Sequence, residues 1–221
     1  MSTTARTLAT VALLALGLAS APSSATADEA PTAEQITQIE QYYESGAWAR
    51  DTARVTARAT RFLTTRVRAT RAPRRLVAVF DIDDTALSTY DCMKAGAFAD
   101  GRRSACVVLD PHPAIEPVRA LVKLAQRKGV AVAFVTGRPE YIRSVTLSQL
   151  RRAGFGGRFE LLLRPADDHR ESVVPFKAGA RKSLQRGGRR VIFSIGDQQS
   201  DLDGGFALRT FKLPNPMYAL P

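Results

Sequence analysis

The chain has 221 residues, of which 45% are hydrophobic and 24% are charged, and its formal net charge at pH 7 is +11. It has no internal repeat and no low-complexity tract, so it is read as a folded chain with a substantial core rather than a repeat or disordered protein. The positive charge favours anionic partners, but it does not choose among phosphorylated small molecules, phosphate-rich cell-surface polymers and nucleic acid.

Residues 1–27 have the pattern of a signal peptide. Arg6 precedes an apolar stretch from Leu8 to Ala19, and Ala25-Thr26-Ala27 offers small residues where signal peptidase reads, which predicts cleavage before Asp28. The apolar stretch is shorter than the roughly 20 residues needed to span a bilayer. No cysteine lies near the cleavage point to carry a lipid anchor. We therefore expect a secreted, soluble protein without a membrane-spanning segment. Its mature form would have 194 residues and a charge of +10, since Arg6 is lost with the leader.

Residues 32–71 have helical periodicity and are predicted to form two helices, broken near Ser45-Gly46 and ending before Pro73. We assign them to an N-terminal helical extension, residues 28–72. One face of the second helix is basic. It carries Arg50, Arg54, Arg58 and Arg61, here called the arginine stripe. The stripe is either a phosphate-binding surface or a solvated face, and charge runs of this kind favour the solvated face.

From residue 73 onward apolar runs alternate with amphipathic segments. Strands are predicted at 76–80, 130–135, 159–163, 191–195 and 208–212, and helices at 116–128, 139–153 and 177–186. Gly129 is expected to stop the first of these helices and Pro139 to open the second. Strands separated by helices of this length predict an α/β domain, residues 73–221, with a doubly wound, mostly parallel sheet covered on both faces.

Residues 88–115 do not fit this alternation and lie between the first strand and the first crossover helix. An insertion there would lie over the carboxyl end of the sheet, so we predict a small cap or lid. The segment contains both cysteines of the chain, Cys92 and Cys106. In an exported protein they are expected to form a disulfide worth about 3 kcal/mol, the alternative being two separate buried thiols.

Acidic and phosphate-binding residues follow the predicted strands. Because the carboxyl ends of parallel strands meet at one edge of the sheet, these residues are expected to lie together. They would supply a carboxylate nucleophile, a second carboxyl group for proton transfer, hard oxygen ligands for Mg²⁺ and groups that bind a phosphoryl oxygen. The residues are Asp81, Asp83, Asp84, Thr85, Thr136, Gly137, Lys177, Asp197 and Asp201.

The order and spacing of these motifs resemble a known family. DxDxT at Asp81–Thr85, then Thr136, Lys177 and GDxxxD at Gly196–Asp201 are similar to the four motifs of the haloacid dehalogenase superfamily. The stretches FDIDDTALS, FVTGRPEYIRSVT, LLLRP, FKAGARKSL, IGDQQSDL and TFKLPNPMYAL resemble the branch of plant-type acid phosphatases and vegetative storage proteins, subfamily IIIB. The resemblance runs from about Leu76 to the C-terminus.

The resemblance implies a role for each acidic residue. Asp81 would be the nucleophile and a metal ligand. Asp83 would be the general acid/base and would bind Mg²⁺ through its backbone carbonyl. Asp197 would be a further metal ligand, and Asp201 would support the metal site or hold the lysine. Asp84 is interpreted as support for the loop.

Thr136, Gly137 and Lys177 would bind the phosphoryl group. Lys177 is preferred to Lys182 on the same helix because it opens the helix and follows Phe176, as the family pattern requires. No firm role is assigned to Arg138. Gln199 departs from the tryptophan frequent in this branch, which leaves the metal site intact and puts the shape of the neighbouring pocket in question.

We therefore expect a secreted Mg²⁺-dependent acid phosphatase that hydrolyses small phosphomonoesters through an aspartyl-phosphate. The alternatives are a non-catalytic storage protein, against which the retained Asp81 argues, and a protein that binds the anionic cell envelope. Weak association with anionic envelope polymers through the arginine stripe is compatible with catalysis. No nucleic-acid-specific binding is expected.

Overall fold

The computed structural model describes residues 30–109 and 111–220, so the predicted signal peptide lies outside the described residues. The helices are α1 (Ala33–Glu44), α2 (Ala47–Arg68), α3 (Tyr90–Ala95), α4 (Asp100–Leu109), α5 (Glu116–Arg127), α6 (Arg143–Arg152) and α7 (Val174–Ser183). The strands are β1 (Leu76–Phe80), β2 (Ala131–Pro139), β3 (Glu160–Arg164), β4 (Arg190–Gly196) and β5 (Thr210–Lys212).

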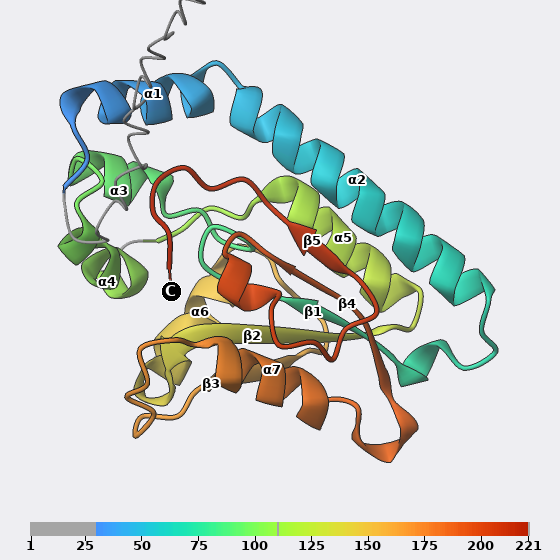
Figure 1. Ribbon diagram of the computed structural model, residues 1–221. Coiled ribbons are helices and arrows are strands. Elements are labelled where there is room, and N and C mark those ends of the chain that lie inside the picture. Colours follow the sequence, from blue (N-terminus) through green and yellow to red (C-terminus); the bar gives the residue numbers. More distant parts are fainter. Residues whose placement is uncertain (1–29, 110, 221) are drawn as a thin grey trace, which may run out of the picture.

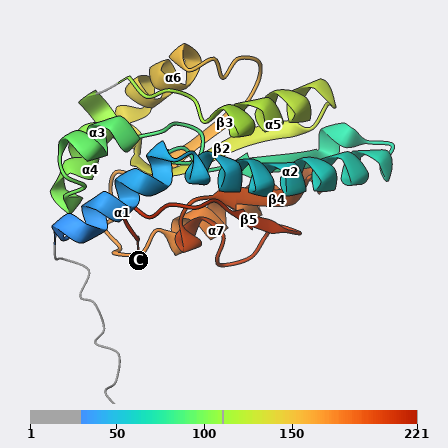
Figure 2. The ribbon, with the colours of Figure 1, turned by 90° about the horizontal axis from the view of Figure 1, so that it is seen from above.

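All five strands are parallel and form one sheet in the order β3-β2-β1-β4-β5 (Figure 1). The central strand β1 is buried along its whole length, and its side chains alternate between two cores. Ala78 and Phe80 pack in the core that includes α2 and α5, whereas Val77 and Val79 pack in the core that includes α7. Helices therefore cover both faces, as Figure 2 also shows, and the predicted doubly wound fold is confirmed.

Glycines with positive φ mark two helix boundaries that the sequence predicts. Gly46 (φ +73°) separates α1 from α2, and Gly129 (φ +72°) follows α5. An L-residue with a side chain rarely adopts this backbone conformation, whereas glycine adopts it at little cost. Among the helices of residues 30–109 and 111–220, none combines the length and the apolar character that crossing a membrane requires.

Two boundaries near the site differ from the prediction. Pro139 does not open a helix: it is the last residue of β2, where it pairs with Arg164 of β3, and α6 begins at Arg143 after a short 3-10 turn. The pairing of β2 with β3 shifts register between Thr136 and Pro139, and such irregular positions in a sheet tolerate proline. The other difference is α7, which begins at Val174 with Pro175 in its first turn, so Lys177 lies one turn inside the helix.

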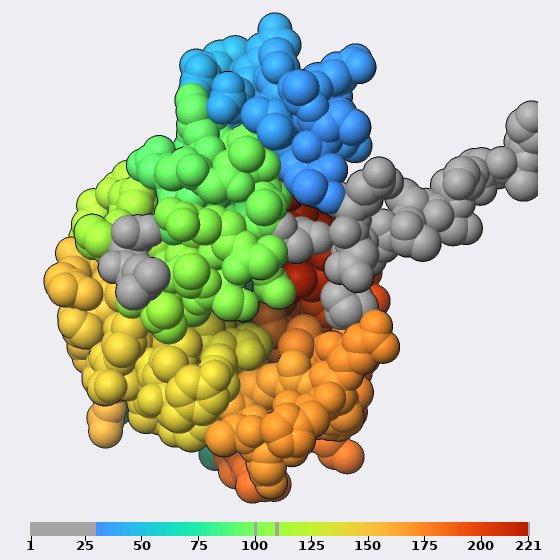
Figure 3. Space-filling view, turned by 90° about the vertical axis from the view of Figure 1, so that its left-hand side faces the viewer, coloured from blue at the N-terminus to red at the C-terminus, as the bar shows by residue number. Residues whose placement is uncertain are grey.

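Residues 88–115, predicted as a small cap or lid insertion with no assigned secondary structure, contain α3 and α4. The disulfide between Cys92 and Cys106 joins these helices, with 5.7 Å between the two Cα atoms, and confirms the predicted pairing. The segment packs against Ile39 of α1 and Met217 near the C-terminus. In Figure 3 its green surface lies between the blue surface of α1 and the yellow surface around α6. Residues 88–115, here called the disulfide-linked segment, therefore pack against both α1 and the segment that follows β5.

Candidate active site

The predicted site residues lie around one cavity of about 380 Å³ at the carboxyl end of the sheet. Segments that follow β1, β2 and β4 contribute to its wall, together with α4 and α7. The lining includes every residue predicted to bind metal or phosphate or to act in catalysis: Asp81, Asp83, Thr136, Gly137, Lys177, Asp197 and Asp201. The fold thus brings these residues together, while their chemical roles remain predictions.

Lys177 lies between two of the carboxylates. Its ammonium Nζ is 2.7 Å from Asp81 Oδ1 and also donates to Asp201 Oδ1, and all three side chains are buried. Burial alone would lower the pKa of Lys177, but the charges of Asp201 and Asp81 outweigh it and raise the pKa above the usual lysine value. The lysine therefore stays charged. Lys182 is exposed and lies over the Phe206 ring, away from this group.

Three buried carboxylates could hold a metal ion. Ligand oxygens of Asp81, Asp197 and Asp201 lie within 4.8 Å of one another. Burial, followed by the neighbouring Asp201 charge, raises the pKa of Asp197 to about 7 and that of Asp81 well above its usual value. A divalent cation would relieve this repulsion, and carboxylate oxygens are ligands that Mg²⁺ favours. The residues therefore fit a magnesium ion.

Side chains around Asp197 fix its carboxylate. Thr85 Oγ1 donates to Oδ1 at 2.9 Å, and Gln198 Nε2 and Asn215 Nδ2 donate to Oδ2 at 2.6 and 2.8 Å. Lys212 donates to the backbone carbonyl of Asp197. Groups of this kind orient a metal ligand. Sequence reasoning did not assign roles to Asn215 and Lys212, although both lie in the tail TFKLPNPMYAL that resembles the family.

Asp83 does not join the carboxylate cluster; its side chain pairs with Arg138. Arg138 Nε donates to Asp83 Oδ2 at 2.9 Å and Nη2 donates to Oδ1 at 2.6 Å. Burial raises the pKa of Asp83, but the charge of Arg138 and its hydrogen bonds outweigh burial and hold the pKa below its usual value. No role was assigned to Arg138 because the sequence places it near the carboxyl ends of the strands without showing which carboxylate it pairs with.

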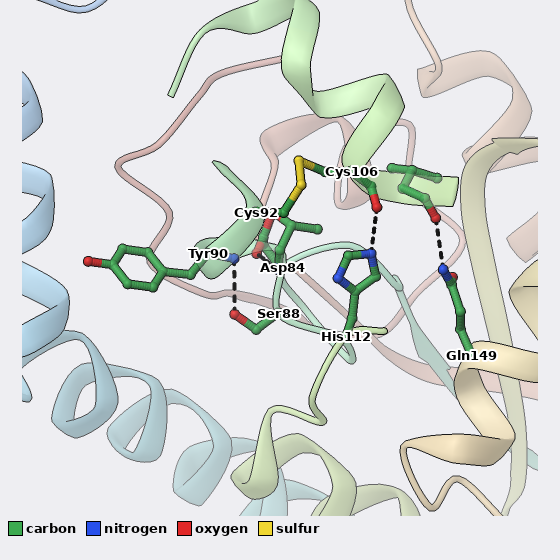
Figure 4. Close-up of a disulfide and its surroundings, with 9 residues drawn as sticks. Asp84, Ser88, Tyr90, Cys92, Cys106, His112 and Gln149 are labelled. Atoms are coloured by element: carbon green, nitrogen blue, oxygen red, sulfur yellow. Dashed lines mark hydrogen bonds between the residues drawn. A yellow bond between two sulfur atoms is a disulfide. The ribbon is translucent and has the colours of Figure 1, made fainter. Parts of the chain in front are cut away.

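Asp84 closes the loop behind the site. Its backbone has a φ of +51°, which is uncommon for a residue other than glycine. Its carboxylate accepts hydrogen bonds from the backbone N–H and hydroxyl of Thr89, at 2.8 and 2.6 Å, and from the Tyr218 hydroxyl at 2.6 Å. Burial nevertheless raises the pKa of Asp84 to about 6, against the effect of these bonds. Thr89 is the N-cap residue of α3, so these bonds tie the Asp84 loop to the start of the helix that contains Cys92 (Figure 4).

The outer wall of the cavity combines polar and apolar side chains. Helix α4 contributes Arg103 and Val107, among others, and Tyr141 contributes a ring that is 77% exposed. The Arg103 guanidinium lies 5.4 Å from the centre of the Tyr218 ring, which also lines the cavity. The disulfide-linked segment therefore takes part in shaping the site.

Comparisons with known proteins point to one family. The family model described as "HAD superfamily, subfamily IIIB (Acid phosphatase)" matches residues 2–221. Acid phosphatase 1 of Solanum lycopersicum is 37% identical over 65% of this chain and 59% of its own length. Vegetative storage protein 2 of Arabidopsis thaliana is 31% identical over 66% of this chain and 57% of its own. The chain thus spans less than two thirds of the length of these relatives.

A solved structure supports the fold. The class C acid phosphatase from Bacillus anthracis superposes with a TM-score of 0.63, covering 84% of this chain and 85% of that one. At 17% sequence identity this likeness concerns the fold alone. The family match over nearly the whole chain, the motifs that line one cavity and the shared fold agree. The chain belongs to the HAD (haloacid dehalogenase) superfamily, subfamily IIIB, the acid phosphatase subfamily.

Proposed function

We propose that the protein is a secreted, Mg²⁺-dependent acid phosphatase that hydrolyses phosphomonoesters through an aspartyl-phosphate on Asp81. The main support is the buried Asp81 carboxylate, which faces the Lys177 ammonium at 2.7 Å in a cavity that Asp83 also lines. A nucleophile, a cation for phosphate oxygens and a second carboxyl group for proton transfer are thus within one small space.

The reaction has two steps. In the first, an Asp81 carboxylate oxygen forms a bond to phosphorus while the bond from phosphorus to the ester oxygen breaks, and Asp83 gives a proton to the departing alcohol. In the second, Asp83 takes a proton from a water molecule that attacks phosphorus. The bond from phosphorus to Asp81 then breaks and inorganic phosphate is released. The proton that Asp83 takes from the water balances the one it gave to the alcohol, and cleavage of the bond to phosphorus restores the Asp81 carboxyl group.

Other residues of the cavity bind and orient the phosphoryl group. Lys177, held by Asp201, is placed to contact a phosphoryl oxygen next to Asp81. Thr136 and Gly137 line the same wall and complete the proposed phosphate contacts. Mg²⁺ would be held by Asp81, Asp197 and the backbone carbonyl of Asp83. When bound it would supply positive charge that stabilises the phosphate oxygens.

The domain assignment follows the same proposal. Residues 1–27 act as the secretion leader, residues 28–72 as the N-terminal helical extension, and residues 73–221 as the phosphatase domain. Residues 88–115 act as a cap whose helix α4 contacts the leaving group, as the position of Val107 on the cavity wall suggests. This cap would set the choice among phosphomonoesters.

Hydrolysis of 4-nitrophenyl phosphate with and without a chelator tests the function. We expect activity that EDTA removes and added Mg²⁺ restores, and an Asp81→Asn variant without activity. Acid-quenched intact-mass analysis should show a phosphorylated wild type and an unmodified Asp81→Asn protein. Asp167→Asn, which changes an exposed carboxylate, is the matched control. The proposal fails if Asp81→Asn keeps full activity, or if wild type with Mg²⁺ is inactive from acid to neutral pH.

The arginine stripe supports a second role, binding of anionic envelope polymers. Arg50, Arg54, Arg58 and Arg61 are all exposed on one side of α2. We expect retention on an immobilised polyphosphate column, decreasing with salt, and loss of that retention when all four are changed to glutamine. Unchanged retention of this variant would show that the stripe is not the binding surface.

A further inference from the structure

We propose that Arg138 is a positioning residue for Asp83, and that Gln149 connects this pair to helix α4 of the disulfide-linked segment. The inference rests on the proposed function of Asp83 as the general acid. It assigns a purpose to a buried arginine that neither contacts the predicted metal cluster nor matches a predicted role.

The contact between Arg138 and Asp83 fixes the carboxyl group in one orientation. The guanidinium engages both carboxylate oxygens, through Nη2 to Oδ1 and Nε to Oδ2. An ionised carboxylate has about four acceptor sites, so a two-point contact leaves sites free on the other side, where the carboxylate can take up a proton. The Arg138 side chain is 2% exposed and that of Asp83 is 20% exposed. The remaining carboxyl surface is therefore accessible, and Asp83 lines the cavity.

The third guanidinium nitrogen of Arg138, Nη1, does not contact Asp83 and instead binds side chains of α6. It donates to Gln149 Oε1 at 2.6 Å and to Thr146 Oγ1 at 3.3 Å. Both partners belong to α6 and are buried. Rotation of Arg138 would leave buried polar groups without partners, which is costly, so the planar group is locked in place. Asp83 is thus held by a rigid support rather than by a mobile surface pair.

Gln149 also binds the segment above the site. Its amide Nε2 donates to the backbone carbonyl of Val107 in α4 at 3.0 Å, a contact drawn in Figure 4. Val107 lines the cavity, and its neighbour Cys106 is fixed both by the disulfide and by a contact of 2.7 Å between its carbonyl and His112 Nε2. One amide group therefore joins the helix that faces the leaving group to the residue that orients the acid.

The chemistry of the leaving group provides a specific readout. An alkoxide is a poor leaving group and needs the proton from Asp83, whereas 4-nitrophenolate is a stabilised anion and can depart without it. Since kcat/KM reports steps up to departure of the alcohol, misplacing Asp83 should lower kcat/KM for an alkyl ester far more than for 4-nitrophenyl phosphate. A general loss of folding or of phosphate binding would lower both equally.

The experiment compares kcat/KM for ethyl phosphate and 4-nitrophenyl phosphate at saturating Mg²⁺. For Arg138→Gln we expect a loss at least about tenfold larger with the ethyl ester, which lies within the range of general acid catalysis. Gln149→Leu should change the ratio of the two kcat/KM values, ethyl phosphate to 4-nitrophenyl phosphate, in the same direction by a smaller factor. Arg152→Gln, an exposed arginine on the same helix α6, is the control and should leave the ratio unchanged.

A double-mutant comparison separates positioning from structure. In an Asp83→Asn background, Arg138→Gln should cause no further selective loss with the ethyl ester, because Arg138 acts through Asp83. Equal losses with the two esters, or the same selective loss in the Asp83→Asn background, would overturn the inference. Should Arg138→Gln not fold, as judged by circular dichroism, an unchanged ratio in folded Gln149→Leu would overturn it. Phosphorylation of wild-type Asp81 would still support the proposed function in each of these cases.

Discussion

Removal of the disulfide should destabilise the protein by an amount that follows from its loop. Cys92 and Cys106 are 14 positions apart, and the link closes a loop of about 15 residues, which corresponds to about 3 kcal/mol in the chain-entropy account. For a domain of this size that equals a decrease in Tm of about 6–12 °C. We expect this loss of unfolding free energy for the Cys92→Ala/Cys106→Ala variant, measured by urea and thermal unfolding against wild type under non-reducing conditions.

The same variant should also affect the cavity, because Cys106 directly precedes Val107 on the cavity wall. Leu63→Ala is the matched control: it removes a fully buried side chain of α2, costs about 2–5 kcal/mol, and does not touch α4. We expect KM for 4-nitrophenyl phosphate to rise in the cysteine variant and to stay near wild type in Leu63→Ala. A stability loss below about 1 kcal/mol would refute the loop-closure reasoning, and an equal change of KM in both variants would refute the link to the cavity.

Two further predictions concern the buried charges. Lys177→Met should abolish detectable phosphatase activity and lower the unfolding free energy by about 3–5 kcal/mol, because it leaves Asp81 and Asp201 without their cation. Urea unfolding with and without Mg²⁺ measures the loss of stability. A Lys177→Met variant that is as stable as wild type in the absence of Mg²⁺ would contradict the prediction. Asn215→Ala should weaken Mg²⁺ binding about 10- to 100-fold, because the Asn215 amide orients the Asp197 carboxylate. Calorimetric titration with Mg²⁺ should show this loss of affinity for Asn215→Ala and an unchanged affinity for the Asp167→Asn control.

Much of the fold was predictable because β1 and β4 are mostly apolar runs followed directly by acidic motifs. β1 at 76–80 matches its prediction residue for residue, since a strand buried on both faces has a continuous apolar pattern. Pro139 was misassigned because a proline suits the first turn of a helix and also the last position of a strand. The helices of residues 88–115 were missed because they are short and their burial depends on contacts with α1 and the C-terminal tail.

For the site, the sequence predicts which residues gather at the strand ends but not how their side chains pair. The distances from Lys177 to Asp81 and Asp201 depend on where α7 begins. The predicted start of this helix was wrong by three residues. The pair of Asp83 with Arg138 involves a residue at the register shift between Thr136 and Pro139 of β2, and no local pattern indicates this pairing. The catalytic roles of Asp81 and Asp83 stay predictions, which the phosphorylation and leaving-group experiments test.

The path of the C-terminal tail has a practical consequence for protein production. Tyr218 and Leu220, which follow β5 along the chain, both line the cavity. An affinity tag fused directly after Leu220 would therefore begin at the wall of the pocket and compete with small ligands for it. Protein intended for kinetics is better purified with a removable tag placed before α1.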